Sequence, residues 1–124
     1  MKRAIVCSVL AIAAVGANAE QAMLDIAGTF VTGSMFRKQP YLQQTVYVEG
    51  VIDGLISARV MAADGKRSRA LALCIGTMDA DLDQLTAIVT KHMDANPEQW
   101  GLPMPVIITA SMAEACNKIG KPIG

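Results

Sequence analysis

Residues 81–97, with the sequence DLDQLTAIVTKHMDANP, decide the fold class. Their apolar side chains recur every three or four positions, as on one face of an amphipathic helix. That face carries Leu82, Leu85, Ile88, Val89, His92 and Met93. Asp81 is the candidate N-cap, with Gln84 three residues later as in a capping box, and Pro97 ends the pattern. The stretch therefore predicts a helix of about four turns.

Three further helices are predicted around this one, over residues 32–39, 40–63 and 105–117. Gly50 and Gly54 lie four apart in the second of them, which predicts the close approach of another backbone. Residues 64–69 are expected to form a polar, basic loop, and residues 118–124 a loose tail. The five aromatic residues are few and alanine is abundant, which favours helices over sheets. The prediction is an all-α fold, a small bundle of about four helices tied by one disulfide.

The N-terminus has the three parts of a secretory signal peptide. Lys2 and Arg3 precede an uncharged apolar run over residues 4–15, and the small-residue site Ala17-Asn18-Ala19 follows. A helix that crosses a bilayer needs about 20 residues, and this run is shorter. The alternatives to a signal peptide are a short membrane anchor and a buried helix. We predict cleavage after Ala19 and export to the periplasm. Residues 20–124 would then be one helical domain, with a core over about 31–117.

Two cysteines, Cys74 and Cys116, remain after this cleavage. In an oxidising compartment they are expected to pair, and two buried free thiols are the alternative. The bond would close a loop of about 43 residues and stabilise the fold by about 4 kcal/mol. The remaining chain has nine basic and 11 acidic side chains, and this small acidic excess argues against nucleic-acid binding.

Catalytic and metal-binding patterns are not evident. His92 is the one histidine, and its place on the apolar face predicts a core or half-buried side chain rather than a general base. Asp79, Asp81 and Asp83 have the spacing that opens a calcium loop, but Gln84 stands where that loop needs glycine. Helix capping explains these carboxylates better. We expect no enzyme activity, no cofactor and no metal.

A protein-binding role is the remaining class. Trp100, the one tryptophan, lies in a Gly/Pro-rich loop beside Glu98 and Gln99. Tryptophan is enriched at interface hot spots, but large aromatic residues are also usually mostly buried. Two interpretations therefore stay open for Trp100: contact with a partner, or cover for the core.

Several stretches together resemble the Tai-type immunity proteins, which neutralise peptidoglycan amidase effectors of type VI secretion. Residues 47–54, YVEGVIDG, are similar to the family signature G-Y-x-x-G-x-x-D-A, and residues 88–98, IVTKHMDANPE, to its V-V-x-K-Y-L-x-x-x-P-E run. The alanine-rich segment that ends at Cys116 is similar to its closing helix. The resemblance covers about residues 31–116. The matching signature residues are Tyr47, Gly50, Asp53, Gln84 and Pro97.

The chain departs from the family pattern at a few positions. Val46 replaces the first glycine of the signature, Gly76 replaces a proline, and His92 replaces a tyrosine. The family often has a second disulfide between its first two helices. In this chain Arg37 or Lys38 occupies one of those regions and Gln44 the other, so both ends of that bridge are absent.

The resemblance implies an all-helical periplasmic protein, often a homodimer, that binds an amidase effector and occludes its active site. As contact regions we predict the loop segment Glu98, Gln99 and Trp100 and the acidic segment Asp79, Asp81 and Asp83. After signal cleavage no membrane partner is expected. The alternative function is a periplasmic helical stress chaperone or another protein-binding module.

Overall fold

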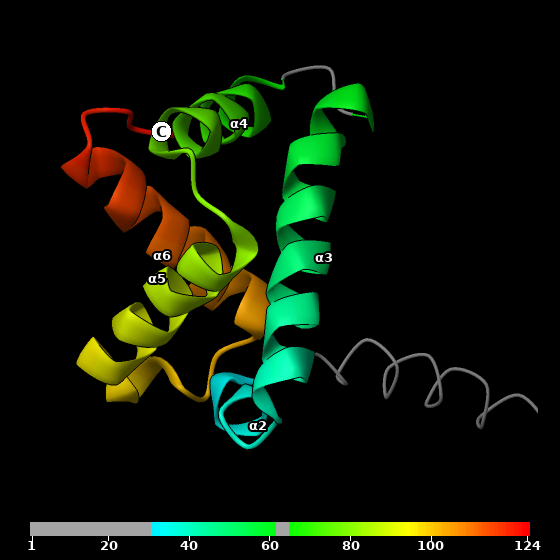
Figure 1. Ribbon diagram of the computed structural model, residues 1–124, viewed down its shortest axis with the longest axis vertical. Helices are drawn as coiled ribbons and strands as arrows, with labels where there is room; N and C mark the ends of the chain where they lie inside the picture. The colour runs from blue at the N-terminus through cyan, green and yellow to red at the C-terminus, as the bar shows by residue number, and fades with distance from the viewer. Residues whose placement is uncertain (1–30, 62–64) are drawn as a thin grey trace, which may run out of the picture. The chain divides into compact units, whose positions relative to one another are not determined.

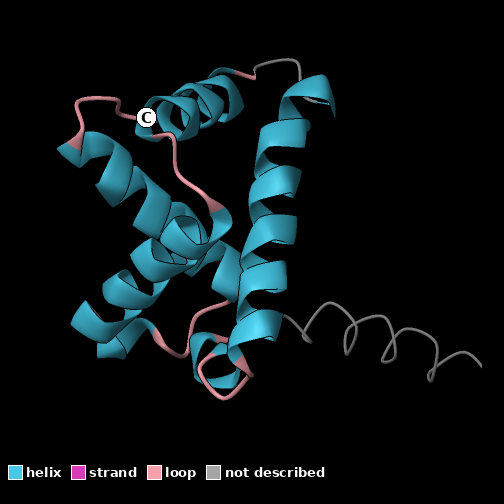
Figure 2. Ribbon diagram, viewed as in Figure 1, coloured by secondary structure: helices cyan, strands magenta, loops and turns pink. Residues whose placement is uncertain are grey.

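The computed structural model describes residues 31–61 and 65–124, and in this part of the chain every regular element is helical (Figures 1 and 2). A single isolated bridge joins Thr32 and Pro103. The elements are α2 (Gly33–Phe36), α3 (Tyr41–Met61), α4 (Lys66–Met78), α5 (Leu82–Ala95), the 3-10 turn η1 (Pro97–Gln99) and α6 (Met104–Lys118). The all-α prediction is confirmed. None of the helices described is long and apolar enough to cross a membrane.

Helix α6 lies at the centre of the packing, because it contacts α2, α3, α4 and α5. The sequence predicts deep burial for it, since apolar side chains surround most of its circumference. Its fully buried residues are Met104, Ile107, Ile108, Ser111, Met112 and Cys116. Phe36 from α2, Val48 from α3 and Val89 from α5 pack into the same core. Such burial of apolar surface is the main stabilising contribution in a domain of this size.

The predicted ends of α5 are confirmed. The Asp81 carboxylate accepts a hydrogen bond from the Gln84 backbone N–H at 2.8 Å, which satisfies one of the free donors of the first turn. The helix ends at Ala95, with Asn96 as its C-cap and Pro97 beyond it. The capping residue and the proline thus fixed both boundaries locally.

Helix α4 corrects the prediction of a basic loop over residues 64–69. Lys66, Arg67 and Arg69 lie in the first turn of this helix. Positive charge there opposes the helix dipole, so the local sequence favours a loop. Leu71 and Cys74 are buried on the inner face of α4. Tertiary packing of this face outweighs the unfavourable charges at the start of the helix.

The predicted disulfide is confirmed. It joins Cys74 to Cys116, whose Cα atoms are 5.8 Å apart. Because Cys74 lies within α4, the bond ties α4 to the last turns of α6.

The C-terminal segment is ordered, which corrects the prediction of a loose tail. Gly120 adopts a left-handed conformation with φ of 71° just beyond α6. The Lys121 N–H donates to the Cys116 carbonyl at 2.8 Å and the Gly120 N–H to the Asn117 carbonyl at 3.0 Å, as in a Schellman motif. This turn redirects the chain, and Ile123 packs into the core with 8% of its surface exposed.

The glycines that allow close packing are not the pair expected from the sequence. A Cβ atom at Gly50 or Gly54 would meet nothing within 4 Å, so the predicted close approach to this part of α3 is wrong within the described chain. At Gly33 a Cβ would lie 2.9 Å from both the Trp100 Cα and the Ile107 Cδ1. The close backbone contact is therefore between α2 and the loop before α6.

Alanine at these positions is expected to have opposite effects on stability. Gly33→Ala should lower the free energy of unfolding by about 1–3 kcal/mol, because the Trp100 backbone must move. Gly50→Ala and Gly54→Ala should each raise it by up to about 1 kcal/mol, because alanine is the better helix former and fits without contact. Urea unfolding of the three variants measures both effects. A destabilised Gly50→Ala would show that another chain approaches this surface.

Candidate functional site

Trp100 covers the core at the corner between α2 and α5. Its indole N–H donates to the Met93 carbonyl at 2.8 Å, and the Arg37 guanidinium lies 4.2 Å from the ring centroid. Arg37 also pairs with Asp94 of α5. The half-buried ring packs against the core cluster. Of the two interpretations from sequence, these contacts support the structural one, and contact with a partner stays a prediction.

Glu98 and Gln99 lie in η1, directly before Trp100. Glu98 is exposed, whereas Gln99 is half-buried, and its Oε1 is 3.2 Å from His92 Nε2. Gln99 therefore connects this turn to His92 of α5, a contact that was not predicted from the sequence.

The acidic segment 79–83 has identifiable structural roles. Asp79 ends α4 in a left-handed conformation with φ of 49°, and Asp81 caps α5. Asp83 accepts a hydrogen bond from the Tyr41 hydroxyl at 2.7 Å, which raises the pKa of Tyr41 because it favours the protonated phenol. All three carboxylates belong to exposed residues. A partner that contacts these carboxylates would therefore have to bind beside the first turn of α5.

The two predicted contact segments do not form one patch. One precedes the first turn of α5 and the other follows its last turn. The 14 residues of α5 separate them by about 20 Å along the helix axis. A single partner would have to extend along α5 to contact both.

The family-signature residues serve different purposes. Tyr47 packs edge-on against Phe36 with ring centroids 6.0 Å apart, and its partial burial raises its pKa. The Gln84 backbone N–H donates the hydrogen bond to Asp81 that caps α5, and Pro97 is the first residue of η1. Gly50 and Asp53 are exposed on α3.

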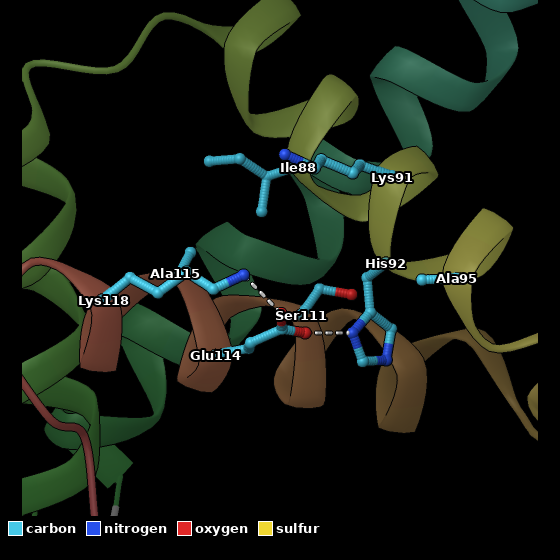
Figure 3. Close-up of a pocket in the computed structure, with 8 residues that line it drawn as sticks. All are labelled: Ile88, Lys91, His92, Ala95, Ser111, Glu114, Ala115 and Lys118. Atoms are coloured by element: carbon cyan, nitrogen blue, oxygen red, sulfur yellow. Dashed lines mark hydrogen bonds and ion pairs between the residues drawn. The ribbon is translucent and has the colours of Figure 1, made fainter.

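A groove between α5 and α6 was not predicted from the sequence. It has a volume of about 330 Å³, and Figure 3 shows the side chains that line it. We call it the α5–α6 groove. Its lining residues are Ile88, Lys91, His92 and Ala95 from α5 and Ser111, Glu114, Ala115 and Lys118 from α6. Small side chains on both helices leave this space open.

One wall of the groove is a row of polar contacts. His92 Nδ1 lies 2.8 Å from Glu114 Oε2, and Lys118 donates to the other oxygen of the same carboxylate at 2.5 Å (Figure 3). The His92 side chain is only 9% exposed, while that of Glu114 is 47% exposed. The Lys118 hydrogen bond, followed by the one with His92, lowers the pKa of Glu114 to about 2.

This pKa predicts a stability loss in acid. Glu114 ordinarily titrates near 4.5, so its contribution is present above that pH and disappears as the pH falls toward about 2. Glu114→Gln removes the titrating group. Between pH 5 and pH 2.5 its urea midpoint should therefore fall less than that of the wild type. Equal falls in both proteins would show that the carboxylate is not held by Lys118 and His92 in solution.

The groove places a serine, a histidine and a glutamate together, but their hydrogen bonds do not form a catalytic relay. A nucleophilic serine would need its hydroxyl bonded to the histidine. The Ser111 hydroxyl donates to the Ile107 carbonyl at 2.7 Å, and His92 Nε2 faces Gln99. Among the described residues no group of three or more His, Cys, Asp or Glu side chains could hold a metal ion. The arrangement is suited to fixing His92 rather than to reaction.

Comparison with known proteins places the chain among immunity proteins. The family model described as Rap1a immunity proteins matches residues 13–116. The match begins inside the predicted signal peptide, contains every helix from α2 to α5 and ends at the disulfide residue Cys116. No curated protein matches the chain, and no solved structure does.

Proposed function

The chain belongs to the Rap1a immunity protein family, and from this we propose that it protects its own cell by binding a type VI secretion effector in the periplasm. The match over residues 13–116 is the observation that carries the proposal. An immunity protein is an inhibitor of an effector rather than an enzyme. The hydrogen bonds of Ser111 and His92 are consistent with this role, because neither group is free for nucleophilic chemistry.

We further propose that the effector is a peptidoglycan amidase. The support is the similarity of residues 47–54 and 88–98 to the Tai-type signature. Inhibition would follow from occlusion, since an interface of ordinary size buries about 800 Å² on each partner and can cover a catalytic groove. The segments Glu98–Trp100 and Asp79–Asp83 are the contact regions proposed from sequence.

Export to the periplasm rests on the predicted signal peptide and on the paired cysteines. The signal peptide lies outside the described residues. The Cys74–Cys116 bond supports export, because such bonds persist in oxidising compartments. A homodimer is implied by the family resemblance, and light scattering after size-exclusion chromatography measures it directly.

The test begins by sequencing the genes beside the one for this chain, where we expect a peptidoglycan amidase effector, and then uses that effector. Cells that export this effector to the periplasm should lyse, and co-export of the full chain should prevent lysis. The same chain without residues 1–19 should give no protection, because it stays in the cytoplasm. In vitro, an equimolar amount of the oxidised protein should stop peptidoglycan hydrolysis. Hydrolysis that continues with excess protein would contradict the proposed target.

A further inference from the structure

We propose that the α5–α6 groove is a docking site for an acidic segment of the effector, with an apolar side chain seated beside Ile88 and Ala115 and a carboxylate against Lys91. The proposal rests on the function proposed above and names the surface and the partner chemistry. Neither predicted contact segment includes the groove-lining residues.

The shape of the groove favours a protein side chain. Its volume of about 330 Å³ lies at the small end of ligand-binding pockets. The small side chains of Ala95 on α5 and Ala115 on α6 leave the groove unfilled, and Ile88 supplies an apolar wall. In Figure 3 the Ile88 side chain points into the space between the two helices. An apolar side chain of the partner would exclude water from these surfaces.

The charge of the groove selects an acidic segment. The Glu114 carboxylate is already shared by Lys118 and His92. Lys91 lines the groove, and it forms no ion pair with any residue of 31–61 or 65–124. The groove lining therefore keeps an unmatched positive charge. The chain after Ala19 as a whole has more acidic than basic residues, so the groove differs in charge from the rest of the chain. A carboxylate beside the apolar side chain of the partner would complement this charge.

The groove is also held in one arrangement before binding. His92 is fixed from both sides, by Glu114 of α6 and by Gln99 of η1. A preformed wall loses little conformational entropy when a partner binds. Gln99 belongs to the predicted contact segment 98–100, so the groove continues into that surface. A single partner could contact the groove and the segment 98–100 together without extending along the whole of α5.

Two substitutions test the groove with the amidase effector as the probe. Ala115→Leu fills it, and Lys91→Glu reverses its unmatched charge. Each should weaken effector binding about tenfold or more, the usual effect of losing an important interface contact. Lys91→Arg should bind like the wild type. The matched controls are Ala58→Leu on α3, which adds the same side-chain volume, and Arg69→Glu on α4, which reverses one positive charge in the same way. Both positions are exposed and lie outside the groove, so each control should change affinity less than about twofold.

Isothermal titration calorimetry gives the affinities, and urea unfolding shows that each variant is folded. Hydrogen–deuterium exchange of the wild type needs no substitution, and in the complex it should slow at residues 88–95 and 111–118. If the wild type does not bind the effector, the proposed function fails. If it binds, but both groove variants bind equally well and exchange is unchanged there, the docking site is wrong and the function stands. Loss of a dimer in Ala115→Leu with effector binding retained would assign the groove to a second copy and overturn the proposal.

Discussion

Replacing both Cys74 and Cys116 by alanine is expected to lower the free energy of unfolding by about 4 kcal/mol. The two residues are 42 positions apart, so the bond restricts a large part of the unfolded chain. The chain-entropy relation gives about 4 kcal/mol for a loop of this length. Domains of this size have a total stability of about 5–15 kcal/mol, so the loss is a large share of it. The variant should populate the unfolded state measurably at physiological temperature.

Urea unfolding of three forms separates the bond from the packing of its sulfur atoms. Both half-cystines are completely buried, so alanine also removes core contacts. The reduced wild type keeps the sulfur atoms and loses only the bond. Its urea midpoint should be well below that of the oxidised wild type, and the midpoint of the double variant should be lower still by the packing of the two sulfur atoms. Coincident midpoints for the oxidised and reduced wild type would contradict the expected stabilisation.

The elements that the sequence predicted well carry their own local signals. Asp81 and Pro97 mark the ends of α5, and the three- and four-residue spacing of its apolar side chains defines its buried face. The pairing of Cys74 with Cys116 followed from a count of two cysteines and an oxidising compartment. These features depend on neighbours in sequence or on composition, which is why they could be predicted without a structure.

The elements that the sequence missed depend on distant contacts. Helix α4 begins with basic residues that favour a loop, and its stability comes from Leu71 and Cys74 in the core. The sequence predicted a loose tail that included Ile123, because the packing site of this residue is formed by other segments. Gly33 faces Trp100, which is 67 positions later in the chain. No local pattern could have indicated that contact.

The candidate site also has one feature with a local sequence signal and others that depend on distant contacts. The burial of His92 was predicted from its place on the apolar face of α5, and its side chain is 9% exposed. Its partners Glu114 and Gln99 could not be predicted, because packing of α5 on α6 and the turn of η1 bring them to it. The one local signal for the groove was the pair Glu114 and Lys118, four residues apart on α6, a spacing that allows contact on a helix.

Trp100→Ala is expected to lower the free energy of unfolding by about 3 kcal/mol, at the lower end of the range for large aromatic residues because the ring is only half-buried. The substitution removes cover from the core, the hydrogen bond to the Met93 carbonyl and the stacking of Arg37. Trp100→Phe keeps an aromatic ring over the core and loses the N–H donor. It should cost about 1 kcal/mol, the usual net contribution of one such bond. A Trp100→Ala variant with an unchanged urea midpoint would contradict the structural role.

The same variants decide whether Trp100 also contacts the effector. Arg37 covers one face of the indole, so a partner could reach only the remaining exposed surface of the ring. If the role is structural alone, the folded fraction of Trp100→Ala should bind the effector as tightly as the wild type does. Calorimetry well below the unfolding temperature measures this affinity, and urea unfolding supplies the folded fraction. A loss of more than about tenfold in the folded Trp100→Ala protein would place the ring in the interface, because a hot-spot residue produces a loss of that size.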